Sequence, residues 1–315
     1  MKIRKALVLA AALFSFILSF AAQAQDNILN LTDREIPKGV MKQIARGKKM
    51  EIPGTKSNGK NWGRDVSVVT LRGKTNHFGI DITQTPPKYI DYWATVPGVK
   101  VWVPEYPETK DMDIQTDDTG WWTMHVVKYS GEDLGFSYIY EKDGWVTTKT
   151  NVIPVTDEDD LDLAIQYIDP FYYYVAMKPT VDAMIRQFTG GLAGFENAMV
   201  ITVGKSWASM HDGRLPHGDP GALAISTPQA GIGPVYFNEA VAPDPTYTRT
   251  SVDGGVVWFN VAVGQYPVTA EKDGVNYPTI MFDINPDDIA NGVELYISST
   301  PDSVEGDNDS PPGDY

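Results

Sequence analysis

A series of short peptides occurs twice along this chain, in the same order. The clearest pair is Glu-Lys-Asp-Gly at 141–144 and again at 271–274. The remaining pairs are Thr70–Lys74 with Thr202–Lys205, Pro97–Val101 with Pro220–Ala224, Thr116–Gly120 with Thr250–Gly254, and Tyr167–Ile168 with Tyr296–Ile297. Ordered matches whose spacing changes only between them predict two copies of one small domain.

The first 24 residues have the pattern of a secretory signal peptide. Three basic residues within the first five positions precede an apolar run from 6 to 20, and Ala22-Gln23-Ala24 forms a small-x-small cleavage site. A membrane anchor is the less favoured alternative, because the apolar run is short for a span and ends in a cleavage site. We therefore expect an exported bacterial protein, periplasmic or extracellular, whose mature chain starts at Gln25.

Charge and cysteine content narrow the class of protein further. The formal net charge is −15, and loss of the three basic leader residues takes it to about −18. Such a charge excludes binding to nucleic acid or to an anionic membrane through net charge. The chain has no cysteine, which excludes disulfides and a lipid anchor on an N-terminal cysteine. Each half must therefore be stabilised by apolar burial.

From residue 66 onward, short runs rich in Val, Ile, Thr, Tyr and Trp alternate with clusters of Gly, Pro and Asp, as is typical of short β-strands. The Asp-Gly pair in each Glu-Lys-Asp-Gly peptide predicts a tight turn. Residues 178–189 are the one convincing helical stretch, and Gly190-Gly191 end it. We expect a signal peptide at 1–24, a basic arm at 25–65, a β-sandwich at 66–170, a connector with a helix at 171–196, a second β-sandwich at 197–299, and an acidic, disordered tail at 300–315.

The second half carries a recognisable order of motifs. Thr-x-x-Asp-x-Gly begins at Thr250 and leads into an apolar strand, and Gly-x-Tyr-x-Val-x-Ala begins at Gly264. This order resembles the carboxypeptidase regulatory-like, or transthyretin-like, domain. The first half keeps Gly73 and the Pro-Gly and Thr-x-x-x-Gly landmarks, but has Gly135–Tyr138 in place of the Gly-x-Tyr signature. The resemblance implies an all-β fold of two tandem Greek-key β-sandwiches, used as accessory modules that bind proteins or sugars.

One loop offers candidate metal ligands. His211, Asp212, His217 and Asp219 lie within nine positions, and imidazole with carboxylate can bind zinc or copper. The alternative is an ordered polar loop, which the lack of a third histidine favours. Acidic turns at 157–160 and 285–288 could hold Ca²⁺, but turn and strand-edge chemistry explains them better. We therefore expect no cofactor, with Ca²⁺ or a transition metal as the alternative.

Aromatic side chains form the second candidate site. In a strand, one ring of the Trp121-Trp122 pair must point away from the core. Exposed rings could stack on a sugar or anchor a protein partner, whereas the alternative is a core position for one ring and a domain–domain contact for the other. The candidate binding residues are Trp93, Trp102, Trp121, Trp122, Tyr172 and Tyr174.

Familiar catalytic motifs are missing from the sequence. It has no Gly-x-Ser-x-Gly elbow, no cysteine nucleophile, no phosphate loop and no dinucleotide fingerprint. The preferred hypothesis is an exported accessory protein that binds a protein partner or a glycan, without nucleic acid and without membrane insertion. Two alternatives stay open. One is a metal-dependent enzyme that uses the His211/His217 loop; the other is a structural subunit whose basic arm docks on the acidic body of the next chain.

Overall fold

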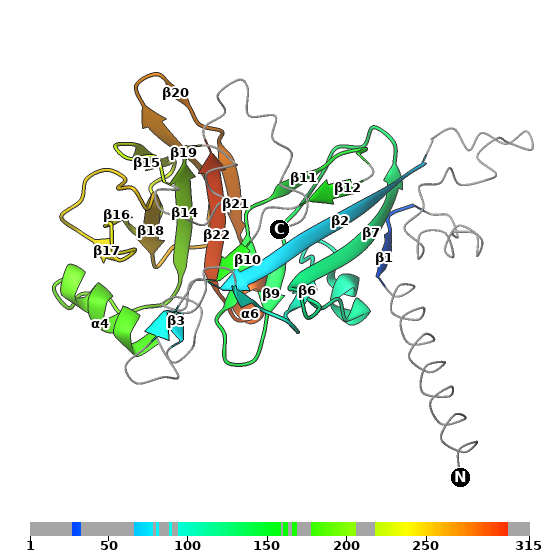
Figure 1. Ribbon diagram of the computed structural model, residues 1–315, viewed down its shortest axis with the longest axis horizontal. Helices are drawn as coiled ribbons and strands as arrows, with labels where there is room; N and C mark the ends of the chain where they lie inside the picture. Colours follow the sequence, from blue (N-terminus) through cyan, green and yellow to red (C-terminus); the bar gives the residue numbers. More distant parts are fainter. Residues whose placement is uncertain are drawn as a thin grey trace, which may run out of the picture.

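A computed structural model describes residues 27–32, 66–77, 80–81, 88–89, 94–158, 160–162, 166–168, 178–205 and 218–301 of the protein, and these are the described residues below. They form an all-β protein in which strands greatly outnumber helices (Figure 1). The predicted signal peptide lies outside the described residues, as do most of the basic arm and nearly all of the tail. Among the described residues, no helix has the length and apolar character needed to cross a bilayer.

The described elements of the first half are β-strands and one 3-10 helix. In chain order they are β1 (Ile28–Asn30), β2 (Val66–His77), β3 (Ile80–Asp81), β4 (Lys88–Tyr89), β5 (Ala94–Thr95), β6 (Lys100–Trp102), η1 (Pro107–Met112), β7 (Trp121–Tyr129), β8 (Leu134–Phe136), β9 (Ile139–Glu141), β10 (Thr147–Thr150), β11 (Ile153–Val155), β12 (Asp160–Asp162) and β13 (Gln166–Ile168).

The described elements of the second half include two helices. In chain order its elements are α4 (Lys178–Phe188), β14 (Ala198–Gly204), β15 (Leu223–Ser226), β16 (Ile232–Phe237), β17 (Pro243–Asp244), β18 (Gly255–Phe259), β19 (Gly264–Lys272), β20 (Val275–Asn276), β21 (Ile280–Ile284), α6 (Pro286–Ala290) and β22 (Val293–Pro301). The predicted helix at 178–189 is confirmed as α4. It ends at Gly190 and Gly191, whose φ angles are 63° and 86°, because glycine adopts this left-handed conformation readily.

The central strands of the two halves pair in the same way. In the first half, β2 pairs antiparallel with β7 and parallel with β12, and in the second half β14 pairs in the same senses with β18 and β22. The facing sheets also correspond, since β9 lies antiparallel between β6 and β10 as β19 lies between β15 and β21. Both halves are therefore β-sandwiches of one design.

Hydrogen bonds locate equivalent residues, and they correct one of the sequence matches. Thr75 N–H donates to Gly120 O (2.9 Å) as Val203 N–H donates to Gly254 O (2.9 Å), so Thr75 and Val203 are equivalent. A match of Gly73-Lys74 with Gly204-Lys205 is therefore three residues out of register. The error arises because a Gly-Lys pair occurs in both halves at positions that are not equivalent.

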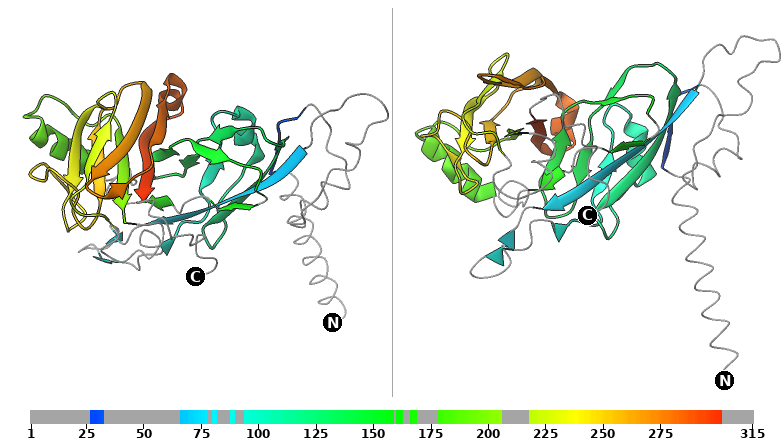
Figure 2. Two further views of the ribbon diagram at one scale, coloured as in Figure 1. Left: turned by 90° about the horizontal axis from the view of Figure 1, so that it is seen from above. Right: turned by 45° about the horizontal axis from the view of Figure 1, so that its top comes forward.

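One sheet runs through both halves. Strand β10 of the first half pairs parallel with β22 of the second, from Thr147 opposite Val293 to Thr150 opposite Ile297. This pairing produces an eight-stranded sheet in the order β17-β16-β18-β14-β22-β10-β9-β6. The views in Figure 2 place the second-half strands, yellow to red, beside the first-half strands, cyan to green, with this sheet joining them.

Two hydrophobic cores cover opposite faces of the shared sheet. Neighbouring residues of one strand belong to different cores, since Ala198 lies in the first and Met199 in the second. The first core fills the first sandwich and continues under helix α4 through Val181 and Ile185. The second core fills the space between β14, β18 and the sheet of β15, β19 and β21. Each sandwich thus packs on its own face of the common sheet.

Candidate functional site

The candidate metal loop lies almost entirely outside the described residues, because only Asp219 of its four candidate ligands is described. Asp219 is buried, and its carboxylate accepts hydrogen bonds from the Lys272 ammonium and the Tyr277 hydroxyl. Within the described ranges, no group of three or more His, Asp or Glu side chains could hold a metal ion. The metal site at His211, Asp212 and His217 stays a prediction.

Each of the two acidic turns contributes a carboxylate that pairs with a buried lysine. Asp157 contacts the Lys128 ammonium, and its other oxygen accepts from the Gly131 N–H (2.6 Å). The hydrogen bonds from Lys128 and then Gly131 lower the pKa of the Asp157 carboxyl below its usual value. In the second turn, Asp288 accepts from Lys149. Asp157 and Asp288, one carboxylate from each turn, thus form ion pairs with lysines of the first sandwich.

The aromatic prediction is wrong for two of its residues. Trp102 and Trp122 are only 3 % and 2 % exposed and lie in the hydrophobic cores, so neither ring is available to a ligand. Trp122 packs against Gly73, where the Cβ of any larger residue would lie 2.5 Å from the indole nitrogen. Trp121 is half-buried, with the Lys74 ammonium 5.5 Å from the centre of its ring. The remaining candidates, Trp93, Tyr172 and Tyr174, lie outside the described residues.

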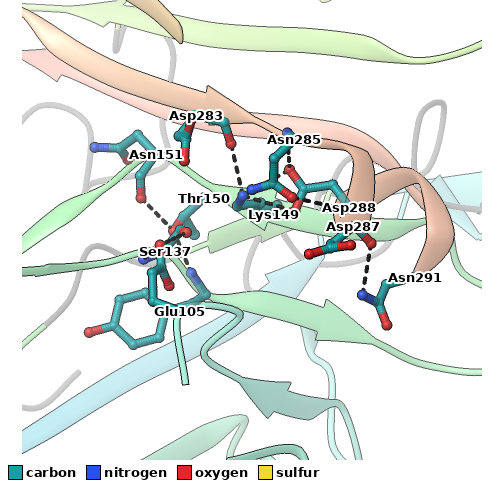
Figure 3. A network of polar contacts seen from close by, with 11 residues as sticks. Glu105, Ser137, Lys149, Thr150, Asn151, Asp283, Asn285, Asp287, Asp288 and Asn291 are labelled. Atoms are coloured by element: carbon teal, nitrogen blue, oxygen red, sulfur yellow. Dashed lines mark hydrogen bonds and ion pairs between the residues drawn. The ribbon is translucent and has the colours of Figure 1, made fainter. Parts of the chain in front are cut away.

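The most developed polar cluster lies where the two sandwiches meet (Figure 3). The Lys149 ammonium, on β10, donates to both carboxylate oxygens of Asp288, on α6, at 2.9 and 2.8 Å. It also donates to the Asp283 backbone carbonyl on β21 (2.8 Å). Both charged side chains are 1 % exposed. Lys149 therefore connects one strand of the first sandwich to two elements of the second.

Asp288 is fixed by the start of helix α6. The Asn285 side chain accepts from the Asp288 N–H (3.2 Å), and the Asp288 carboxylate accepts from the Asn285 N–H (3.0 Å), so the two residues form a capping box. The capping box thus orients the Asp288 carboxylate independently of Lys149. The sequence contains the signal for this cap, Asn-Pro-Asp-Asp, but nothing in it pairs the cap with a lysine 139 positions earlier.

Further hydrogen bonds join the two sandwiches next to the buried pair. Ser298 Oγ donates to Asn151 Oδ1 (2.8 Å), and the Asn151 N–H reaches Ile297 O (3.3 Å). The Val152 N–H donates to Met281 O (3.0 Å). These hydrogen bonds extend the contact between the two sandwiches beyond the end of β10. Chemically, the cluster is an ion pair with satisfied hydrogen bonds, an arrangement that holds two bodies in one orientation.

A second buried carboxyl lies away from this junction. Asp253 precedes β18, and its Oδ2 accepts from the Gly255 N–H (3.0 Å). Burial raises the pKa of Asp253 to about 7, and the Gly255 hydrogen bond opposes this rise. Its turn packs against Gly218, the first described residue of the candidate metal loop. Sequence reasoning assigned Asp253 only to the repeated turn, because burial of a carboxyl leaves no local sequence signal.

Comparison with known proteins yields distant structural similarities. No protein-family model matches the sequence, and no curated protein matches it. The Bacillus anthracis TIE protein is similar at 11 % identity over 75 % of this chain and 34 % of that chain, with a TM-score of 0.21. A chain of a type II cohesin–X–dockerin complex from Acetivibrio cellulolyticus matches at 17 % over 32 % of this chain and 56 % of that chain, with a TM-score of 0.20.

The shaft pilin SpaA from Lactobacillus rhamnosus GG matches at 10 % identity over 75 % of this chain and 98 % of that chain, with a TM-score of 0.19. This chain therefore spans about a third of the first of these structures and a little over half of the second. Similarities this distant carry no argument about function, which must come from the chain's own residues.

Proposed function

We propose that this chain is an exported, non-catalytic module that works by assembling with protein, as a structural or binding subunit. The observation that carries the proposal is the junction of its two sandwiches. Backbone pairing of β10 with β22 and the buried Lys149–Asp288 pair join them into one body. Two independent binding domains on a linker need no such junction, whereas a subunit that must keep a fixed length and orientation does.

The carboxypeptidase regulatory-like identity of both halves belongs to the same proposal. Equivalent strand pairings in the two sandwiches support a duplicated domain, as do the matching threonine contacts at Thr116 and Thr250. Export directed by the signal peptide at 1–24 is also part of the proposal. In this account the accessory role follows from a rigid scaffold that leaves loops and sheet edges free to contact other proteins.

Charge suggests how such subunits associate. The chain is strongly acidic, yet nine lysines and arginines lie between Arg34 and Arg64. A basic segment of one chain is complementary to the acidic body of the next, and this attraction is screened by salt.

Sedimentation velocity of the mature chain tests the proposal. We expect species larger than a monomer that grow with concentration at about 0.02 M salt and disappear at about 0.5 M salt. A variant in which Lys42, Lys48, Lys49 and Lys56 are changed to Gln should dissociate at lower salt, whereas changing Lys100, Lys142 and two further lysines outside the arm should not. A chain that stays monomeric at every concentration and salt level contradicts the assembly role.

A further inference from the structure

The first sandwich depends on a strand from outside its own repeat. Strand β1 pairs parallel with β7, with Ile28, Leu29 and Asn30 opposite His125, Val126 and Val127. Further backbone bonds run from the His125 N–H to Asn27 O (2.9 Å) and from the Leu31 N–H to Val127 O (2.8 Å). The Leu29 side chain is 1 % exposed and lies in the first core. Strand β1 therefore covers the edge of β7 and contributes a side chain to the core.

The second sandwich covers the same edge differently. In the second sandwich, β18 is the equivalent of β7. On its side away from β14, β18 pairs with β16, a strand of the same repeat. The first sandwich has the 3-10 helix η1 between β6 and β7, where the second has β16 and β17 between β15 and β18. Of the described strands, β1 alone pairs with β7 on the side away from β2. Without β1, the first sandwich has an open strand edge and loses a core side chain.

The position of β1 in the chain makes it exchangeable. It lies just after the expected cleavage site, with only Gln25 and Asp26 between that site and Asn27. On its other side, 35 positions, from 31 to 65, separate it from β2, a length that can reach roughly 115 Å when fully extended. A terminal strand can leave its edge without threading through the protein, and this tether is long enough to reach a neighbouring chain.

We propose that β1 is an exchangeable strand, and that the β7 edge of one chain accepts β1 of a second copy. The second copy is the natural occupant because its Ile28–Asn30 segment reproduces every contact that the chain's own segment makes. Parallel addition of a strand to an open edge is a known mode of protein association, and exchange of identical elements between copies costs little. The proposal deepens the assembly role above and rests on it.

The absence of cysteine from the chain allows a direct test. Ile28 and His125 are opposite each other and both half-buried, and neighbouring strands lie about 4.8 Å apart, within the range that a disulfide spans. An Ile28→Cys chain is refolded together with a tagged His125→Cys chain, at about 10 µM and at about 1 mM, and then oxidised. We expect a disulfide between the two chains that increases at least about fivefold with concentration, because a tethered strand has an effective concentration on the order of 1 mM.

Three controls identify the cause of the cross-link. Ile28→Cys paired with Thr248→Cys, an exposed position in the second sandwich, reports random collisions. Adding Leu29→Asp to the Ile28→Cys chain should abolish the specific product, because an unpaired carboxylate cannot replace Leu29 in the core. The double variant Ile28→Cys/His125→Cys should form a disulfide, within one chain at low concentration and increasingly between chains at high concentration.

The proposal is overturned if the 28–125 product between chains never exceeds the 28–248 product, whether or not the double variant closes within one chain. The lysine-to-glutamine variants of the arm leave β1 and β7 unchanged, so the two proposals fail separately. If association depends on salt but the cross-link between chains does not form, strand exchange alone is contradicted. If the cross-link forms but association does not depend on salt, only the role of the basic arm is contradicted.

Discussion

Lys128 and Lys149 are both nearly inaccessible to solvent, and they differ in what surrounds their partners. Asp157, the partner of Lys128, has a side chain that is 43 % exposed, whereas Asp288, the partner of Lys149, is 1 % exposed. A buried pair gains little net stability over an apolar replacement, but removal of one partner leaves an uncompensated charge. Lys149 and Asp288 are thus best understood as residues that fix the relative orientation of the two sandwiches.

Changing Lys149 to Met tests this role at a single residue. We expect the free energy of unfolding, measured by urea denaturation, to fall by about 3–5 kcal/mol, because the Asp288 carboxylate stays buried without its cation. Lys178→Met is the matched control, since the Lys178–Glu294 pair is about one-third exposed on both sides. Exposed pairs contribute about 0–1 kcal/mol. Equal losses in the two variants would contradict the account.

Asp253 predicts a pH dependence of stability. Its pKa is raised from 3.8 to about 7 in the folded protein by burial, so its protonated form favours folding. This stabilisation is fully present below about pH 4 and is lost as the pH rises through 7, because the folded chain must then hold a buried charge. Relative to Asp253→Asn, the wild type should lose stability between pH 4 and pH 7 and change little above. A difference that is constant from pH 4 to pH 8 would rule this out.

At the scale of elements, one threonine closes the same loop in each sandwich. Thr116 Oγ1 accepts from the Val99 N–H (2.9 Å) and donates to Val96 O (2.6 Å). Thr250 Oγ1 makes the corresponding bonds to the Ala222 N–H (2.8 Å) and Asp219 O (2.5 Å). These repeated contacts explain why the Pro-Gly and Thr-x-x-x-Gly landmarks occur together in both halves.

Replacing either threonine with valine should therefore have the same effect. Each change leaves a buried N–H and a buried carbonyl without their hydroxyl partner, so we expect a loss of about 1–3 kcal/mol in both Thr116→Val and Thr250→Val. Thr248→Val, at an exposed position, should change stability by less than about 0.5 kcal/mol. Thermal and urea unfolding measure the three variants. A cost confined to one half would show that the loops are not equivalent.

Local features of these elements could be predicted from the sequence, and pairings between them could not. The Asp-Gly turns are confirmed, with φ of 81° at Gly144 and 77° at Gly274. Register was harder to predict, since Leu161 rather than Tyr167 occupies the place of Tyr296 in the repeat. The buried position of Trp122 depends on Gly73 of the adjacent strand, and no pattern within β7 alone contains that information.

At the scale of the whole molecule, the decisive feature is a pairing between distant segments. The duplication predicts two sandwiches but not that β10 of one meets β22 of the other, because both strands could equally form free edges. The sequence likewise predicts a basic arm at 25–65 and no strand at its start, since three residues are too few to produce a periodic pattern. Both junctions, β10 with β22 and β1 with β7, therefore became visible only in the three-dimensional arrangement.

Amide hydrogen exchange of the mature chain tests the central claim most directly. If the two sandwiches share one sheet, the amides of β10 and β22 should exchange as slowly as those of the central strand β14, through global unfolding. The Asp244 amide of β17, at one edge of the shared sheet, provides the reference for an edge that exchanges fast. Exchange of residues 147–151 at the rate of β17, with β14 still protected, would contradict the account, because it would show two separate sandwiches.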